Sequence, residues 1–338
     1  MPERKLYTSP MSQSNTITDI QALKRNRERA RSDSLFLQHA AKEETLERAQ
    51  SVNKLFKSTA IVAAFPKIWA DCEDSTIVID EKEALPLPVG KYDLVIHSLG
   101  LHWSNDTVGQ LIQCRRALEP DGLLLAVTLG GQTLHELRSC LAQAESTLTG
   151  GLSPRVIPMG EVRDLGGLLQ RAGLALPVAD TVPIKAIYKD MWHLMRDLRG
   201  MGETNAMNAR LRNITRSTVI NLAAELYMEN YPAKQGGITA TFELIVLTGW
   251  APSENQQKPL RPGSALSRLS DALGTNENSL SDWPETKTVY LTPIDKQKTA
   301  KNARYWTNGE TAGKRSRRSP GNTNCARWYP FVKSWYAR

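Results

Sequence analysis

The chain has 338 residues, with 43 Lys and Arg against 35 Asp and Glu, which give a formal net charge of +8. This length allows one large domain or two small ones. The basic excess lies in residues 283–338, which hold 12 basic and 3 acidic residues and leave 31 basic and 32 acidic residues in the rest of the chain. The charge therefore gives no reason to expect specific nucleic-acid binding by the body of the protein, and no apolar run approaches the ~20 residues that a membrane-spanning helix needs.

The N-terminal part of the chain predicts two helices followed by two strands. Residues 1–17 lack the apolar core of a secretory signal, and we predict that they form a disordered extension. A charged helix is expected at 18–31, where Asp19 is a candidate N-cap, and a second helix with an apolar stripe is expected at 34–52. Buried strands are predicted at 58–65 and 75–80.

The most informative stretch runs from Tyr92 to Arg138. Two apolar strands, YDLVIHSL and GLLLAVTL, are joined by an amphipathic helix at 107–118 and a turn at 119–122. Strands joined by a helical crossover are parallel and have helices on their faces, so the segment predicts a doubly wound, mostly parallel Rossmann-like α/β sheet. In such sheets ligands bind beyond the carboxyl ends of the strands, which places a candidate site at 97–106 and 128–133.

The remainder of the chain predicts further helices and strands and then a loop-rich end. Helices are predicted at 132–148, 161–172, 190–200 and 215–227, and strands at 177–188 and 238–250. Gly173 follows the second of these helices as a natural C-cap. The pattern indicates one α/β domain over 18–252 with an abbreviated N-terminal half, followed by a loop-rich segment over 253–282 that holds one short helical piece near 265–273.

The tail from Trp283 to Arg338 shows neither helical nor alternating periodicity. It holds four of the eight Trp and the basic run KRSRR at 314–318. Basic residues with interspersed aromatics can bind single-stranded nucleic acid. The alternative, which the composition favours, is an appended extension without a fold, and we predict that the tail is disordered.

Several kinds of site are not indicated by the sequence. The four Cys lie far apart without a CxxC pair, so neither a zinc site nor a disulfide framework is expected. The chain also lacks a G-x-S-x-G turn, an H-E-x-x-H pair and a phosphate-binding G-x-x-x-x-G-K-[ST] loop. We therefore predict no metal site and a reducing, cytoplasmic location, with the periphery of the inner membrane as an alternative.

Seven motifs, in their order along the chain, resemble one known family. They are SLGLHWSND, RRALEPDGLLLAV, LGGQTLHELR, GGLSPR, DLGGLLQRAG, MRDLRGMGETNA and TFELIVLTGWAP. Over about 18–282 the chain resembles the class I methyltransferase-like proteins related to the mitochondrial complex I assembly arginine hydroxylase. It is more distantly similar to the malonyl-carrier-protein methyltransferases of biotin synthesis. The resemblance implies a seven-stranded methyltransferase-type sheet and S-adenosylmethionine as the cofactor.

The chain departs from this family in the loop after its first strand. Members that bind the cofactor carry a D-x-G-x-G-type loop there, because the backbone must approach the cofactor without a Cβ in the way. Here the strand is followed by Ala-Ala-Phe65-Pro66, and no glycine occurs between Leu55 and Val89. Asp80 matches the acidic position beside the adenine. The resemblance thus implies a cofactor site that is half retained.

The resemblance also assigns residues at the end of the strand that begins at Tyr92. Ser98, Leu99 and Gly100 would face the cofactor together with Asp80. His102 and Trp103 would face the cofactor sulfonium and the substrate, and Asn105 would orient the substrate, so these three are the candidate catalytic residues. The alternative for His102 and Trp103 is an edge histidine beside a packed tryptophan.

Substrate binding is assigned to two further segments. Gly130 and Gly131 would let a ligand approach the backbone, or else form a strand-to-helix turn that requires a positive φ. Arg199, Glu203 and Asn205 belong to a family motif in a lid-like region, for which the alternative is a solvated helix end with internal ion pairs.

Three functions remain open at this point. The first is methyl transfer from S-adenosylmethionine to an unidentified acceptor, which requires an oriented nucleophile and a dry pocket. The second, implied by the resemblance, is hydroxylation of an arginine in a respiratory complex I subunit, or assistance in the assembly of that complex. The third is a non-catalytic scaffold that has kept the fold and a partner surface. The altered glycine loop is the sequence feature that distinguishes the two enzyme hypotheses from the scaffold hypothesis.

Overall fold

A computed structural model of the protein describes residues 16–72, 75–80 and 83–256. The predictions for the first 15 residues, for the helical piece near 265–273 and for the tail from Trp283 lie outside the described residues. Within the described ranges, no helix is long and apolar enough to cross a membrane.

The core of the molecule is a six-stranded sheet with the order β2-β1-β3-β4-β6-β5. The strands are β1 (Thr59–Ala63), β2 (Ser75–Val78), β3 (Tyr92–Ser98), β4 (Leu118–Leu129), β5 (Ala175–Tyr188) and β6 (Ile238–Trp250). The first four are parallel, whereas β6 runs antiparallel to both β4 and β5. The prediction of a mostly parallel Rossmann-like sheet is confirmed.

The seven-stranded sheet implied by the resemblance is wrong for the described part of the chain, which forms six strands. β1 and β2 are joined only by residues 64–74, whose described part holds the short 3₁₀ helix η2 (Pro66–Trp69). A helix, a strand and a second helix cannot fit into so few residues. β1 therefore pairs directly with β2 on one side and with β3 on the other, which confirms the abbreviated N-terminal half.

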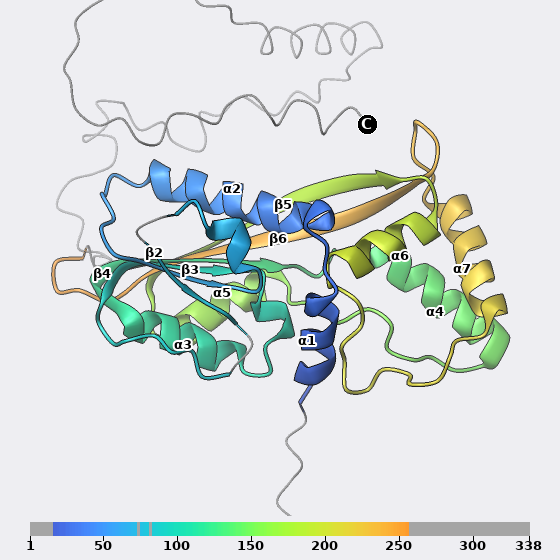
Figure 1. Cartoon of the computed structure of the whole chain (residues 1–338), viewed down its shortest axis with the longest axis horizontal. Helices are drawn as coiled ribbons and strands as arrows, with labels where there is room; N and C mark the ends of the chain where they lie inside the picture. Colours follow the sequence, from blue (N-terminus) through green and yellow to red (C-terminus); the bar gives the residue numbers. More distant parts are fainter. Residues whose placement is uncertain (1–15, 73–74, 81–82, 257–338) are drawn as a thin grey trace, which may run out of the picture. The chain divides into compact units, whose positions relative to one another are not determined.

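Helices cover both faces of the sheet. The helices are α1 (Ile20–Glu28), α2 (Phe36–Ser51), α3 (Thr107–Ala117), α4 (His135–Thr149), α5 (Val162–Arg171), α6 (Met191–Gly200) and α7 (Ser217–Asn230), and the short 3₁₀ helices are η1 (Ser32–Ser34) and η3 (Leu101–Trp103). Figure 1 shows α2 on one face and α3 with α5 on the other. In β1, Ile61 packs on the α2 side and Val62 on the opposite side. Burial of both faces explains why this strand reads as a continuous apolar run.

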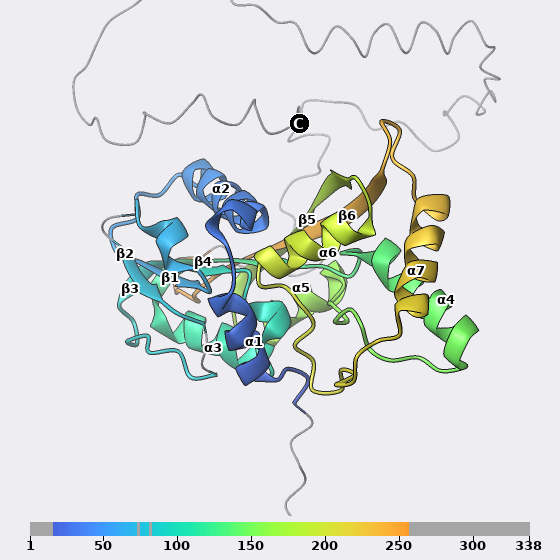
Figure 2. The same ribbon diagram turned by 45° about the vertical axis from the view of Figure 1, so that its right-hand side comes forward.

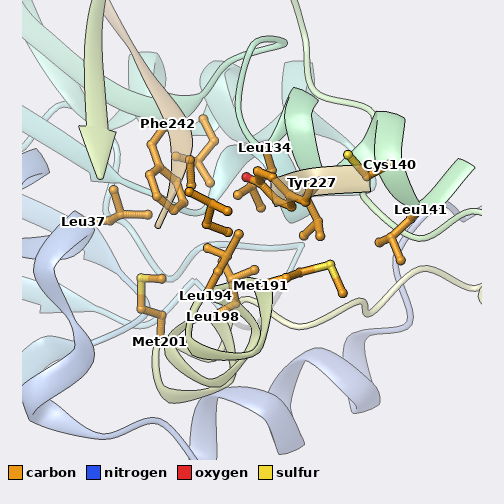
Figure 3. Close-up of a cluster of buried hydrophobic side chains, with 14 of the residues drawn as sticks. Leu37, Leu134, Cys140, Leu141, Met191, Leu194, Leu198, Met201, Tyr227 and Phe242 are labelled. Atoms are coloured by element: carbon orange, nitrogen blue, oxygen red, sulfur yellow. The ribbon is translucent and has the colours of Figure 1, made fainter. Parts of the chain in front are cut away.

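A second body of packing joins α4, α6 and α7 to the carboxyl ends of β3 and β4. Figure 2 shows these three helices grouped at one end of the sheet. Their apolar faces meet β6 in one cluster that includes Leu194, Tyr227 and Phe242, all fully buried (Figure 3). This cluster lies at the carboxyl ends of β3 and β4, which is the end of the sheet where the candidate site was expected.

Local signals in the sequence position several helix ends. Asp19, Asp106 and Asp190 each cap a helix by accepting a hydrogen bond from a backbone N–H three residues later. Gly173 has φ +78° and follows α5, as its predicted C-cap role requires. The Asp19 and Gly173 predictions are thus confirmed.

The predicted turn at 119–122 needs a correction, because these residues belong to β4. The pairing of β3 with β4 shifts register between Tyr92 and Leu94, and Asp121 has φ +63°. The four residues form an irregularity within the strand, and Gly122 accepts a hydrogen bond from Ala251 N–H.

Candidate functional site

The carboxyl end of β3 carries a strained backbone. Leu99 has φ +47°, a conformation that is unusual for a bulky residue, and its side chain is buried. Ser98 is also buried, and its Oγ has no hydrogen-bond partner among the described residues. Gly100 has φ −117°, so glycine is not needed there for its conformation. It is needed for space, because a Cβ at this position would lie 2.0 Å from Asp80 Oδ2.

Asp80, the predicted adenine-side acid, is held by an arginine of the same chain. Arg27 in α1 donates from Nη1 to Asp80 Oδ1 at 2.6 Å and from Nη2 to Oδ2 at 3.3 Å. The side chains are 6% and 2% exposed, so the ion pair is buried. Both oxygens of Asp80 thus accept hydrogen bonds from one guanidinium, and this bidentate geometry makes such ion pairs strong.

Little space remains around this ion pair. The cavity lined by Arg27, Asp80, Gly100, Trp103 and Asn105 has a volume of about 20 Å³, enough for about one water molecule. Pockets that hold organic ligands are commonly about 300–1,000 Å³. The space beside Asp80 therefore does not admit a nucleoside in this structure.

The loop after β1 offers no cradle for the cofactor either. Phe65 is only partly buried, and Pro66 begins η2 and has no backbone N–H to donate. Phe65 lines neither the small cavity nor the larger cleft described below. The residues present at Asp80, at Gly100 and after β1 do not fit S-adenosylmethionine.

The two aromatic candidates beyond β3 converge on one carboxylate. Trp103 Nε1 donates to Glu203 Oε2 at 2.7 Å, and His102 Nε2 lies 3.2 Å from the same oxygen. His102 is 1% exposed and Glu203 is 9% exposed. Burial raises the pKa of Glu203, but the nearby His102 and Arg27 charges and the hydrogen bonds from His102 and Trp103 outweigh it, so the pKa lies below its usual value. Glu203 is therefore an ionised, mostly buried carboxylate.

A second, larger space opens on the other side of Trp103. This cleft has a volume of about 340 Å³. Its apolar wall comes from β4, β6 and the helices α2, α4, α6 and α7, through Leu37, Leu129, Leu134, Leu137, Leu141, Met195, Leu198, Ile220 and Phe242. Its other wall comes from two loops, 155–159 and 203–211, which supply the polar residues Arg155, Glu203, Thr204, Asn205 and Arg210 as well as further apolar ones. The volume of the cleft falls within the range of sites that hold small organic ligands.

The structure brings together most residues assigned to substrate binding. Arg199, Glu203 and Asn205 all line the cleft, as does Trp103. Asn205 joins the two loops, because its Nδ2 donates to the Pro154 carbonyl at 2.8 Å. Arg199 is exposed, and no hydrogen bond or ion pair involves its side chain in the described part of the chain.

Gly130 and Gly131 are placed differently and do not line the cleft. Neither has a positive φ, which Leu134 adopts instead at +53°. A Cβ on Gly130 would lie 2.3 Å from Glu243 Oε2, and one on Gly131 would lie 2.3 Å from Glu161 Oε1. The expectation of a positive φ at these glycines is wrong, because they accommodate neighbouring carboxylates.

Asn105 forms hydrogen bonds with the backbone just before the start of α1. Its Oδ1 accepts from Thr18 N at 2.9 Å, and its Nδ2 donates to the Thr18 carbonyl at 3.2 Å. Asn105 lines the small cavity but not the cleft. Its observed contacts are therefore structural, while its role toward a substrate stays a prediction.

Sequence reasoning missed Arg27 and the pair formed by Glu145 and Arg155. Arg27 lies in a run of basic residues with no local mark that distinguishes it. Glu145 accepts from Arg155 Nη2 at 2.6 Å and from Ser153 Oγ, which fixes the loop that carries one wall of the cleft. These hydrogen bonds lower the pKa of Glu145 to about 2, and the bond from Arg155 makes the largest contribution.

No group of His, Cys, Asp and Glu in the described ranges is arranged to hold a metal ion.

Comparisons with known proteins agree with the fold. A family model described as a methyltransferase domain matches residues 58–126. Arginine-hydroxylase NDUFAF5 of Rattus norvegicus is 39% identical over 231 residues, which cover 66% of this chain and 67% of that protein. Malonyl-[acyl-carrier protein] O-methyltransferase of Laribacter hongkongensis is 32% identical over 187 residues, which cover 55% of this chain and 60% of that protein.

A more remote match is the solved structure of the YcgJ protein from Bacillus subtilis, with a TM-score of 0.39 and 11% identity over 66% of this chain and 100% of that one. The chain spans 60% of the length of the Danio rerio NDUFAF5 and 67% of the Rattus norvegicus protein. This protein has the S-adenosylmethionine-dependent methyltransferase fold and belongs to the family of the arginine hydroxylase NDUFAF5.

Proposed function

We propose that this protein binds a protein partner and takes an arginine side chain of that partner into the cleft beside Trp103. Glu203 is the only acidic residue among those that line the cleft. Both of its hydrogen bonds, to His102 and Trp103, use Oε2, so Oε1 has no partner among the described residues. This free oxygen of an ionised, mostly buried carboxylate is the observation that carries the proposal.

The rest of the cleft suits the remainder of an arginine side chain. An arginine joins a planar cation to an aliphatic stem, and such stems pack well on apolar surface. Trp103 and Leu198 supply apolar surface next to Glu203. The names of the 38–43% identical relatives, which are arginine hydroxylases, support arginine over lysine.

The other arginines at the cleft do not oppose a cationic guest. Arg155 is paired with Glu145 and Arg210 with Asp19, at 2.6 and 2.9 Å. Arg199 stands exposed at the rim, where an acidic residue beside the partner's arginine would neutralise it. We therefore expect the recognised sequence to carry an arginine with an acidic neighbour.

A subunit of respiratory complex I is the partner that the family resemblance implies. Such a partner would bring this protein from the cytoplasm to the inner membrane surface. We also propose that the partner-binding unit is the methyltransferase-like domain at 18–252, since the cleft and both loops lie within it.

The test is a titration with Nα-acetyl-arginine N-methylamide, observed through the indole N–H of Trp103 in a nuclear magnetic resonance spectrum. Trp103→Phe assigns that signal among the tryptophans. We expect a saturable shift with the arginine probe and none with the uncharged citrulline analogue. Glu203→Gln should abolish the shift, whereas Glu225→Gln, at an exposed position in α7, should leave it unchanged. Equal shifts with arginine and citrulline would refute guanidinium recognition.

Methyl transfer from S-adenosylmethionine is a second candidate, and the match of a methyltransferase domain to residues 58–126 favours it. This reaction requires the cofactor to bind, which the small space beside Asp80 does not allow in this structure. Calorimetric titration of the full chain with S-adenosylmethionine decides between the two. Saturable heat at micromolar ligand would restore methyl transfer as the leading function.

A further inference from the structure

We infer that the space at the carboxyl ends of β2 and β3 is a guanidinium-binding site whose ligand is the chain's own Arg27. In this family the resemblance implies a nucleoside there, and the residues present do not fit one. The site in this protein is thus completed by α1 instead of by a cofactor. This inference concerns a different carboxylate from Glu203 and does not depend on the function proposed for the cleft.

The Arg27 guanidinium contacts Asp80 as a bound guanidinium ligand would. Both Nη atoms donate to the two oxygens of Asp80, at 2.6 and 3.3 Å. Gly100 leaves the space that Asp80 occupies, since a Cβ there would lie 2.0 Å from Oδ2. A carboxylate that accepts hydrogen bonds through both oxygens from one planar cation favours a guanidinium over an ammonium.

The helix that carries Arg27 is positioned by contacts on both of its flanks. Ala22 and Leu23 are buried in a cluster with Trp103, Ile157, Ala206 and Met207. Asn26 Nδ2 donates to the Thr204 carbonyl at 3.0 Å, and Asp19 N–H donates to the Ala206 carbonyl at 2.8 Å. Figures 1 and 2 show α1 between α3 and the loop that leaves α6. The same loop carries Glu203, so α1 closes one site and supports the other.

The charges facing Asp80 are consistent with an obligatory cation. Asp80 has Arg27 as its ion-pair partner, with the buried His97 nearby. Burial lowers the pKa of His97, and the attraction of Asp80 does not reverse this, so His97 is neutral and does not replace Arg27. Loss of the Arg27 guanidinium would leave a buried, unpaired carboxylate, which is strongly destabilising.

Chemical rescue tests this inference. Arg27→Ala removes the side chain beyond Cβ, and N-ethylguanidinium supplies the missing atoms. We expect the variant's melting temperature to fall by about 10 °C and to recover most of this loss, saturably, with N-ethylguanidinium. N-ethylurea, which has nearly the same shape without the charge, should not rescue it. Arg25→Ala, an exposed change in the same helix, should neither lose stability nor respond.

Three outcomes would overturn the inference. They are equal rescue by N-ethylurea, an equal response of Arg25→Ala, and a rise in the wild-type melting temperature with S-adenosylhomocysteine. If Arg27→Ala does not fold, side-chain hydrogen exchange in the wild-type chain gives the answer. We expect the Arg27 guanidinium to exchange much more slowly than that of Arg25, and equal rates would contradict a buried, bound guanidinium.

Discussion

Glu145 and Arg155 fix the loop that forms one wall of the cleft. Arg155 bridges from Glu145 to Thr215, with its Nη1 2.5 Å from Thr215 Oγ1, and so links α4 to the start of α7. Ser153 donates to Glu145 from both its backbone N–H and its hydroxyl. The loop is therefore positioned by one buried acid rather than by regular secondary structure.

This ion pair gives a pH dependence of defined sign. The pKa of Glu145 falls from 4.5 to about 2 on folding, so the pair stabilises the fold above pH 4.5 and loses this effect as the pH drops toward 2. The shift corresponds to about 3 kcal/mol at pH 7 and less than half of that near pH 3. We expect Arg155→Met to lower the free energy of unfolding at pH 7 by at most about this amount, because the hydrogen bonds from Ser153 to Glu145 remain, and the gap to wild type should narrow at pH 3.

Urea unfolding at the two pH values measures the effect of Arg155→Met, and Arg163→Met, at an exposed position in α5, is the control. A gap that stays constant between pH 7 and pH 3 would show that Glu145 titrates normally in the folded chain.

At the scale of elements, the docking of α1 depends on a glycine in the loop after α6. Gly202 has φ +77°, and a Cβ there would lie 3.1 Å from Arg27 Cα. Gly202→Ala thus combines an unfavourable conformation with a contact against the α1 backbone. We expect it to lower the free energy of unfolding by about 1–3 kcal/mol. Gly151→Ala, which meets no atom within 4 Å and has an ordinary φ, should change it by less than about 0.5 kcal/mol.

Thermal melting of the two glycine variants gives the comparison. Equal stability of Gly202→Ala and Gly151→Ala would mean that the contact between this loop and α1 contributes nothing, and would also weaken the role assigned to Arg27.

The elements themselves could be predicted where the signal is local. Apolar runs marked β1 and β3, Asp19 marked the start of α1, and Gly173 marked the end of α5. The site could be predicted only in part, because its pairings are distant in the sequence. Arg27 and Asp80 are 53 residues apart, and Trp103 and Glu203 are 100 apart. Nothing local tells which of several basic residues in α1 will meet a buried acid.

The whole molecule divides by charge, and this division has a consequence for association. Residues 283–338 carry 12 basic and 3 acidic residues, whereas the rest of the chain is nearly neutral. Non-specific binding to nucleic acid depends on cationic side chains and weakens steeply with salt. We expect the full chain to bind single-stranded DNA weakly at low salt, and a chain ending at residue 282 to lose that binding.

Fluorescence anisotropy with a labelled oligonucleotide at two salt concentrations measures this effect. Undiminished binding by the shortened chain would place the nucleic-acid contact on the methyltransferase-like domain, contrary to the charge distribution.

The protein keeps the methyltransferase sheet, but the carboxylates of Asp80 and Glu203 have different roles. Asp80 is paired with Arg27 within the chain, whereas Glu203 lines the cleft and its Oε1 has no hydrogen-bond partner among the described residues. The most direct measurement is a crystal structure of the full chain with Nα-acetyl-arginine N-methylamide. We expect a guanidinium nitrogen about 3 Å from Glu203 Oε1, with Arg27 still on Asp80. A probe that displaces Arg27, or a cleft left empty at a concentration that saturates binding in solution, would contradict the account.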